Sequence, residues 1–292
     1  LLVVRDGLGV KPLYYCASND GFAFSSEIKA LMPLVKARGE LDHEAIDRYL
    51  SFIWCPGNAT PFRDIRKLQP GEAFWIREGT ITERFTWFEL PVKRSGRSLG
   101  PKNSSVDYFV QSTEQNLRSA VHRQLVSDVP VGAFLSGGLD SSSIVHFARE
   151  MNPKIHCFSI ETAGNKEGFV DDLPYARKVA KHLDVQLDVI KVDSSSMAED
   201  LESMVFQLDE PLADPAALNV LYISRLARKN GVKVLLSGAG GDDLFTGYRR
   251  HHALLNEKYW DWAPRSIRRG LERLTSSLDQ NRPVFRRIRK LF

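Results

Sequence analysis

The fold of this chain follows from residues 129–142, which read VPVGAFLSGGLDSS. The apolar stretch from Val129 to Leu135 is typical of a buried strand, and the stretch from Ile144 to Ala148 is typical of the first turns of a helix. A turn rich in glycine and serine joins the two. A strand, a tight turn and a helix in this order predict an α/β unit whose turn presents unpaired backbone N–H groups.

The turn is suited to holding an anion. Free N–H groups and the helix dipole favour negative charge at a helix N-terminus. Gly137 and Gly138 allow the backbone to close around the anion, and Ser136, Ser141 and Ser142 add hydroxyl donors. The Walker pattern Gly-x-x-x-x-Gly-Lys-Ser/Thr does not occur in the chain.

Asp140 stands at the centre of this turn. A carboxylate beside a phosphate requires a cation between them, and Mg²⁺ is the expected ion. The pattern resembles the pyrophosphate-binding loop of the ATP pyrophosphatases, which cleave ATP between the α- and β-phosphates and activate an oxygen as an adenylate. The alternative is an ordinary Ser/Gly turn that caps a helix.

A second turn, in residues 235–245 (LLSGAGGDDLF), repeats this order of strand, glycines, acids and helix. Two such turns at neighbouring strand ends can grip one nucleotide from opposite sides, with Asp140 and Asp242 sharing one or two Mg²⁺ ions. These carboxylates would stabilise the negative charge that gathers on the leaving pyrophosphate. The alternative is a flexible glycine turn.

From residue 105 onward, strands and helices are expected to alternate, which predicts a parallel sheet with helices on both faces. The expected strands are Val131–Leu135, Ile155–Ile160, Val185–Val192 and Val232–Leu236, and the expected helices include Val106–Ser127 and Asp172–Leu183. Ligands of such sheets bind at the carboxyl ends of the strands, directly before Ser136 and Ser237.

Residues 1–92 are expected to form a separate, strand-rich domain. The expected strands are Leu1–Arg5, Leu13–Ala17, Phe22–Ser25, Glu72–Arg77 and Thr80–Thr86, with turns at Asn19-Asp20-Gly21 and Glu78-Gly79. Helices are expected at Glu27–Leu34 and, with Asp42 as its cap, Asp42–Phe52. Residues 93–104 are polar and contain Gly and Pro, which indicates a linker, so the second domain is predicted at 105–292.

The composition is that of a globular protein, with 43% hydrophobic and 26% charged residues. No run of about 18 apolar residues is present, so we expect no membrane span. Cys16, Cys55 and Cys157 form no Cys-x-x-Cys pair, and we expect them to be small buried hydrophobes in a cytoplasmic protein. The chain begins within a predicted strand, and we expect it to be a piece of a longer protein.

The net charge of +4 is unevenly distributed along the chain, because residues 264–292 hold nine Arg/Lys and two Asp/Glu. A basic tail raises the possibility of nucleic-acid binding. Ile267, Leu271, Leu274 and Leu278 fall at helical spacing, however, so the arginines are expected on the wet face of an amphipathic helix. We therefore expect no nucleic-acid partner, and we expect His251-His252 to be surface or interface residues.

An acidic loop at residues 209–215 has two possible roles. It could form a wall of the acceptor site or support that site from behind. Alternatively, Asp214 could cap a helix with Pro215 at its first position.

Several segments together resemble the glutamine-hydrolysing asparagine synthetases. Those of the second half are residues 129–142, 209–211 (DEP) and 236–242 (LSGAGGD). Those of the first half, which are similar to the late part of a class II glutamine amidotransferase domain, are residues 5–15 (RDGLGVKPLYY), 24–31 (FSSEIKAL) and 68–71 (LQPG).

This resemblance implies a parallel-sheet ATP-pyrophosphatase domain, preceded by the C-terminal part of an α+β amidotransferase domain of the Ntn-hydrolase type. It implies that glutamine is hydrolysed and that the ammonia attacks a β-aspartyl adenylate, giving asparagine, AMP and pyrophosphate. The implied substrates are ATP, glutamine and aspartate, with Mg²⁺ as the metal and a homodimer as a possible assembly. The implied ATP-binding positions are Phe134, Leu135, Ser136, Gly137, Gly138, Asp140, Ser141, Ser142, Ile160, Ser237 and Gly238, and the implied metal ligands are Asp140 and Asp242.

Two departures from the family pattern qualify this reading. The amidotransferase nucleophile is an N-terminal cysteine whose α-amine takes part in the mechanism, and none of the three cysteines here can replace it. Ala239 stands where asparagine synthetases often carry Glu, which favours a divergent acceptor. Alternatives are therefore the same adenylation in surface-polysaccharide amidation or β-lactam-type ring closure, a tRNA-modifying pyrophosphatase, or a non-catalytic nucleotide-binding partner.

Overall fold

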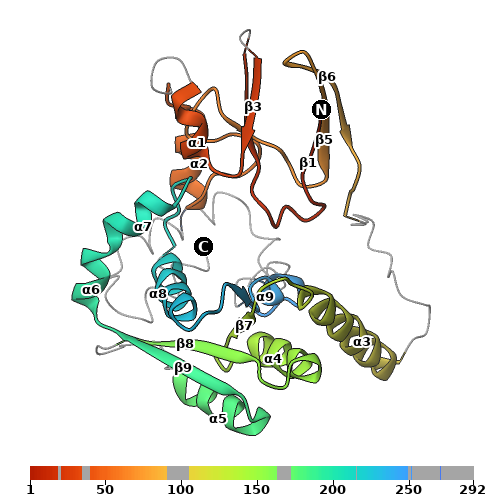
Figure 1. Ribbon diagram of the computed structural model, residues 1–292, viewed down its shortest axis with the longest axis vertical. Helices are drawn as coiled ribbons and strands as arrows, with labels where there is room; N and C mark the ends of the chain where they lie inside the picture. The colour runs from red at the N-terminus through yellow and green to blue at the C-terminus, as the bar shows by residue number, and fades with distance from the viewer. Residues whose placement is uncertain are drawn as a thin grey trace. The chain divides into compact units, whose positions relative to one another are not determined.

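The computed structural model describes residues 1–18, 21–34, 40–90, 105–162, 172–214, 216–248, 251 and 270. These residues form sheets with the strand orders β1-β5-β6, β3-β2-β4 and β10-β7-β8-β9 (Figure 1). The chain divides into two compact units. The first comprises Leu1–Ala120, Phe158–Asp171 and Asp188–Lys233, and the second comprises Val121–Cys157, Asp172–Leu187 and Val234–Phe292.

The first sheet joins the start of the chain to a hairpin. β1 (Leu2–Val4) pairs antiparallel with β5 (Glu72–Arg77), which pairs antiparallel with β6 (Thr80–Thr86). Glu78 and Gly79 form the turn with φ values of 48° and 75°. Positive φ at both central residues is the geometry that matches the twist of a two-residue hairpin. The predicted hairpin and its turn are confirmed.

The second sheet is built on another hairpin. β2 (Tyr14–Ser18) pairs antiparallel with β3 (Gly21–Ser25) and, on its other side, with β4 (Arg66–Lys67). The two predicted strands are confirmed to within one or two residues. Of the predicted turn between them, Asn19 and Asp20 lie outside the described residues.

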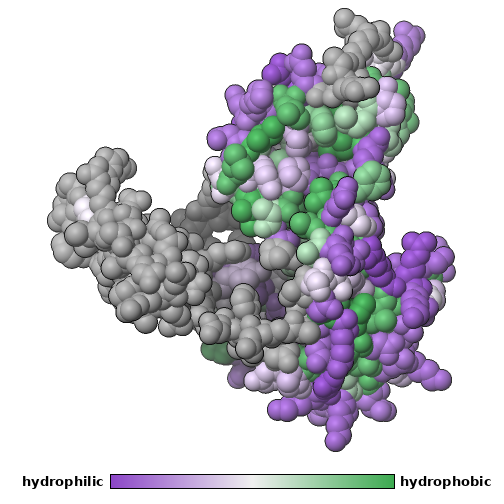
Figure 2. All heavy atoms as spheres, turned by 90° about the vertical axis from the view of Figure 1, so that its left-hand side faces the viewer, coloured by the Kyte–Doolittle hydropathy of each residue, from purple (hydrophilic) through white to green (hydrophobic). Residues whose placement is uncertain are grey.

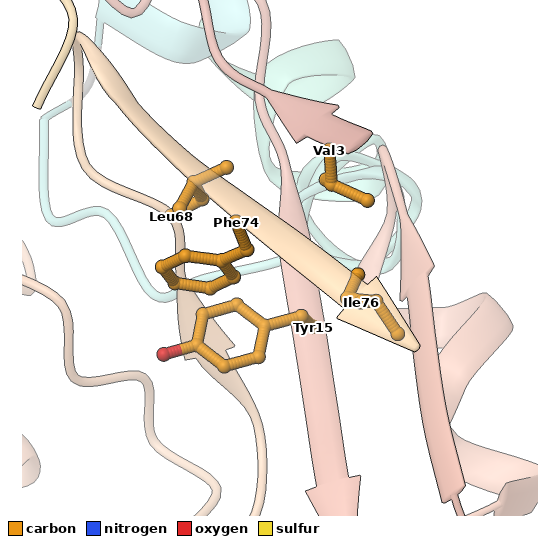
Figure 3. Packing of buried hydrophobic residues seen from close by; sticks show 5 residues of the cluster. All are labelled: Val3, Tyr15, Leu68, Phe74 and Ile76. Carbon is orange, nitrogen blue, oxygen red and sulfur yellow. The ribbon is translucent and has the colours of Figure 1, made fainter. Parts of the chain in front are cut away.

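A small hydrophobic core stabilises this part of the chain. Val3, Tyr15, Leu68, Phe74 and Ile76 are buried together (Figure 3). The rings of Tyr15 and Phe74 meet edge to face with their centroids 5.1 Å apart, a favoured aromatic geometry. The alternation of buried and exposed residues along β5 places Phe74 and Ile76 on the same face of the sheet.

The predicted helix Glu27–Leu34 forms as two shorter pieces. α1 (Ile28–Leu31) is followed by the 3₁₀ turn η1 (Met32–Leu34). Pro33 has no backbone N–H to continue the α-helical hydrogen bonds, which accounts for the change. The second predicted helix is confirmed as α2 (His43–Phe52), and the Asp42 side chain caps it by accepting from the Ala45 N–H at 3.1 Å.

The remaining elements confirm the α/β class. In chain order they are α3 (Val106–Gln124), β7 (Val131–Phe134), α4 (Leu139–Met151), β8 (His156–Thr162), α5 (Leu173–Leu183), β9 (Gln186–Val192), α6 (Ser194–Glu199), α7 (Leu201–Gln207), α8 (Ala216–Lys229), β10 (Val234–Leu236) and α9 (Gly241–Leu244). β10 and β7 pair in parallel, with Leu235 opposite Gly132. The last strand thus lies beside the first strand of this sheet, as the interpretation of two cooperating turns requires.

Three predictions lie outside the described residues: the linker at 93–104, the amphipathic helix of the basic tail, and His252.

Within the described part, no helix is long and apolar enough to cross a membrane. One face of the molecule shows hydrophobic and hydrophilic side chains interspersed (Figure 2). Exposed apolar residues at the end of α2 include Leu50, Phe52 and Trp54.

Candidate active site

The two glycine turns lie at the same edge of the sheet. β7 and β10 are parallel neighbours in which Ala133 lies opposite Leu236. Both strands therefore end at the same level, and the turns that begin at Ser136 and Ser237 leave from adjacent carboxyl ends. This is the edge at which open α/β sheets bind their ligands.

The first turn enters its helix earlier than the sequence indicated. α4 begins at Leu139, so Asp140, Ser141 and Ser142 belong to its first turn and do not precede it. Gly138 is the N-cap, with extended backbone and no side chain to cap the helix. The helix dipole stabilises a carboxylate in the first turn of a helix. This explains why the helix already begins at these polar residues and not at the apolar residues that follow them.

The serines of this turn have different roles. The Ser141 hydroxyl is buried and holds the turn together, 3.0 Å from the Ser136 hydroxyl, and it accepts a hydrogen bond from the Ser136 N–H at 3.3 Å. The Ser142 hydroxyl is buried and has no hydrogen-bond partner among the described residues. Burying a hydroxyl without a hydrogen-bond partner lowers the stability of the folded protein. The Ser142 hydroxyl is therefore the one in this turn that is best placed to bond a ligand atom.

Gly137 is required by packing as well as by the turn. Its φ is +83°, in the left-handed region that favours glycine. A Cβ atom at this position would also meet the backbone of Tyr175 and Ala176, in the first turn of α5. Any side chain here would therefore displace α5 from the loop.

The two turns are packed directly against each other through glycines. A Cβ atom on Gly238 would lie 2.8 Å from the Ser141 nitrogen and 3.0 Å from the Asp140 Cβ. A Cβ atom on Gly241 would overlap the Asp140 carboxylate. The sequence predicted that the turns cooperate, but it missed that Gly238 and Gly241 make room for Asp140.

The second predicted metal ligand, Asp242, follows the glycine that Asp140 contacts, and its own carboxylate lies against Gly247. The Asp140 carboxylate lies against Gly241, the residue directly before Asp242. Asp242 is in the first turn of α9, whose N-cap Gly240 has a φ of +92°. The described residues contain no cluster of three or more His, Cys, Asp or Glu side chains that could hold a metal. Two carboxylates fit Mg²⁺, which commonly takes one or two protein carboxylates and completes its shell with phosphate oxygens and water.

The other predicted ATP-binding residues are distributed over three elements. Phe134 ends β7 and is half-buried, Leu135 follows it and is buried, and Ile160 is half-buried in β8, the next strand in the sheet. Ser237 is exposed after β10, and its hydroxyl accepts a hydrogen bond from the Ala239 N–H at 3.1 Å. Their contacts with a nucleotide stay predictions.

The acidic loop after α7 lies against the first part of the chain. Glu210 contacts Tyr14 and Lys67, and Asp209 contacts the start of α1. Asp214 accepts a hydrogen bond from the Ala216 N–H at 2.9 Å, as expected of a helix cap; Pro215 is outside the described residues. No sequence pattern indicated the partners of Asp209 and Glu210.

The predicted burial of the cysteines is confirmed for two of the three. Cys55 and Cys157 are buried, whereas Cys16 is half-buried. Burial raises the pKa of the Cys157 thiol to about 12. Such a thiol stays protonated near neutral pH and is a poor nucleophile.

Comparisons with known proteins match both halves of the chain. A family model described as "Asparagine synthase" matches residues 112–291, and one described as "Glutamine amidotransferase domain" matches residues 1–87. The exact boundaries of the two domains stay a prediction.

Three curated relatives illustrate the similarity. Asparagine synthetase [glutamine-hydrolyzing] 1 of Bacillus subtilis (strain 168) is 35% identical over 268 residues, which are 91% of this chain and 40% of the relative. A putative asparagine synthetase [glutamine-hydrolyzing] of Mycobacterium bovis is 32% identical over 283 residues, which are 96% of this chain and 42% of the relative. The amidase chyE of Penicillium rubens is 26% identical over 277 residues, which are 90% of this chain and 40% of the relative. The chain thus spans about two fifths of the length of these relatives.

Proposed function

Because the chain belongs to the asparagine synthase family, we propose that the protein carrying it is an ATP-dependent amidotransferase that forms an amide through an acyl adenylate. A carboxylate oxygen of the acceptor attacks the α-phosphorus of ATP, and pyrophosphate leaves. Ammonia derived from glutamine then attacks the acyl carbon, and AMP leaves. Aspartate is the proposed acceptor and asparagine the proposed product.

One observation carries this proposal beyond the family match: Asp140 lies against the second glycine turn at Gly241. Two anion-binding turns at adjacent ends of parallel strands can enclose a triphosphate from both sides. The unpartnered hydroxyl of Ser142 and the first-turn N–H groups of α4 are donors for phosphate oxygens. The remaining ATP-binding residues are proposed on the family resemblance.

Asp140 and Asp242 are the residues proposed to hold Mg²⁺. When bound, the ion would neutralise negative charge on the leaving pyrophosphate. The protein's own contribution is to keep two carboxylates at one edge of the sheet, where glycines leave room for them. ATP, glutamine and the acceptor are the proposed partners, and we expect no nucleic acid among them. The proposed location is the cytoplasm, and the proposed assembly is a homodimer.

A second acceptor deserves its own test because of Ala239. This residue replaces a Glu that asparagine synthetases often carry, and its side chain offers no charge to an acceptor. The similarity to a protein named an amidase is compatible with a different acceptor. The alternative is therefore the same adenylation of another carboxylate, as in surface-polysaccharide amidation or β-lactam-type ring closure.

The deciding experiment uses the complete polypeptide that carries this chain. With ATP, Mg²⁺, aspartate and glutamine or ammonium, we expect asparagine, AMP and pyrophosphate in equal amounts, and ATP–pyrophosphate exchange that depends on aspartate. AMP formation whose rate does not depend on aspartate would favour the alternative in which another carboxylate is the acceptor. The absence of exchange with a panel of carboxylates would contradict adenylation, and a tight complex with tRNA at physiological salt would favour RNA modification.

A further inference from the structure

The loop between α7 and α8 is attached to residues of the first part of the chain, which precede it by 143 to 196 positions. The Tyr14 hydroxyl donates to Glu210 Oε1 at 3.0 Å, and the Lys67 ammonium donates to Glu210 Oε2 at 2.7 Å. Glu210 falls in the segment matched by the asparagine synthase model, whereas Tyr14 and Lys67 fall in the segment matched by the amidotransferase model. Both oxygens of one carboxylate are thus used to join the two segments.

This junction is largely shielded from solvent, because Lys67 is buried and Glu210 is half-buried, unlike the exposed pair of Glu40 and Arg63. The side chains of Lys67 and Glu210 are only 10% and 18% exposed. Lys67 also donates to the backbone carbonyl of Cys55, so its charge has two partners. Burial, followed by the negative charge of Glu210, raises the pKa of Tyr14, so that its hydroxyl keeps the proton it donates. Removing the Glu210 charge would leave the buried Lys67 ammonium without its counter-charge, which is unfavourable.

Two further contacts fix the same loop to the same segment. The Asp209 carboxylate accepts from the Ile28 N–H at 2.9 Å and from the Lys29 ammonium at 3.2 Å, at the start of α1. The Ala213 N–H donates to the Ile53 carbonyl at 2.9 Å. Ile53 is the C-cap of α2 and has a φ of +61°, a rare conformation for a β-branched residue. The loop is therefore tied at three points.

We propose that Glu210 is a positioning residue that couples ammonia delivery to amide formation. This inference rests on the proposed function. Glu210 holds the amidotransferase segment to the loop that leads, through α8 and β10, to the second glycine turn. Neutralising Glu210 loosens this junction and leaves the predicted nucleotide-binding residues unchanged. Ammonia released from glutamine is then lost to solvent before it reaches the adenylate.

The test compares two ammonia sources in the complete polypeptide that carries this chain. For Glu210→Gln we expect amide formation from added ammonium to stay within about twofold of wild type. We expect the amount of amide formed per glutamine hydrolysed to fall at least fivefold, the lower end of typical coupling between sites, about 5- to 150-fold. Tyr14→Phe, which removes one hydrogen bond and no charge, should lower the same ratio by a smaller factor.

A matched control removes an exposed ion pair of the same segment. Glu40 accepts from Arg63 at 2.8 Å with both side chains more than half exposed, and Glu40→Gln should leave the ratio unchanged. In the double variant Glu210→Gln with Lys67→Met, the loss should be smaller than the product of the single losses, because both act on one contact.

Two results would overturn the inference. One is an unchanged ratio in both Glu210→Gln and Tyr14→Phe. The other is an equal loss with ammonium and with glutamine, which would make Glu210 a residue of general stability. Failure of the proposed function gives a different result, since the wild type would then show neither exchange nor ammonium-dependent amide.

Discussion

The carboxylate of Asp140 occupies the space that a Cβ atom on Gly241 would need. The first turn of α4 and the turn before α9 are therefore a single packed unit, although about one hundred residues separate them in the chain. Because the two turns follow parallel neighbouring strands, a change in one of them is transmitted to the other by direct contact.

Replacing Asp140 by Asn should abolish ATP–pyrophosphate exchange. The variant keeps the shape of the side chain and removes the charge that the proposed Mg²⁺ site needs, so we expect a loss of at least about 100-fold. Asp128→Asn is the matched control, because Asp128 is exposed in the turn before β7. Unchanged exchange in Asp140→Asn would remove Asp140 from the metal site.

Replacing Gly241 by Ala should lower the exchange rate without destabilising the fold. Gly241 is the first residue of α9, where Ala is the better helix former, but its Cβ would push the Asp140 carboxylate aside. A displacement of about 1 Å in a catalytic group can cost about 100-fold in rate. Exchange assays and thermal unfolding of the same variant separate the two effects.

Gly240→Ala is the matched control for that variant. A Cβ on Gly240 would meet open space, but its φ of +92° is unfavourable for alanine. We expect Gly240→Ala to lower the free energy of unfolding by about 1–2 kcal/mol and to affect exchange less than Gly241→Ala. The opposite order of activity losses would contradict the close packing of the two turns.

Phe74→Ala should destabilise the amidotransferase segment by about 3–5 kcal/mol, the usual cost of removing a buried aromatic ring. Phe74 is 2% exposed and packs against Tyr15 and Ile76. Phe206→Ala removes the same ring from a site that is 74% exposed and should change the free energy of unfolding by less than about 0.5 kcal/mol. Urea unfolding measures both, and equal losses would mean that this cluster is not a core.

The Cys157 thiol should make stability fall at high pH. Burial raises its pKa in the folded protein from the ordinary value of 9.0 to about 12. Below pH 9 the thiol is protonated in both states, and its contribution is fully present. Between pH 9 and 12 only the unfolded chain loses the proton, so the free energy of unfolding should fall by about 1.4 kcal/mol per pH unit.

The measurement is urea unfolding of wild type and Cys157→Ala between pH 8 and 11. The variant should lack this part of the slope, whatever its stability at pH 8. In native protein at pH 8, a thiol reagent should modify half-buried Cys16 before Cys157. Rapid modification of Cys157 would contradict its burial.

The sequence by itself determined the order of the elements and the chemistry of the two turns. Alternating apolar runs predicted β7, β8, β9 and β10 within a few residues, and Glu78-Gly79 predicted the β5–β6 turn. These signals are local, because side-chain periodicity and backbone conformation depend on residues close together in the chain. The helix start at Leu139 was misplaced, since polar residues in a first turn look the same as those of a loop.

Only the tertiary structure decided which distant residues meet. It placed β10 beside β7, brought Gly241 against Asp140, and paired Glu210 with Tyr14 and Lys67. No local pattern encodes such pairs, because a glycine looks the same in the sequence whether it makes room for a distant side chain or belongs to a flexible turn. The partner of a carboxylate is likewise set by how the elements pack and not by its neighbours in the sequence.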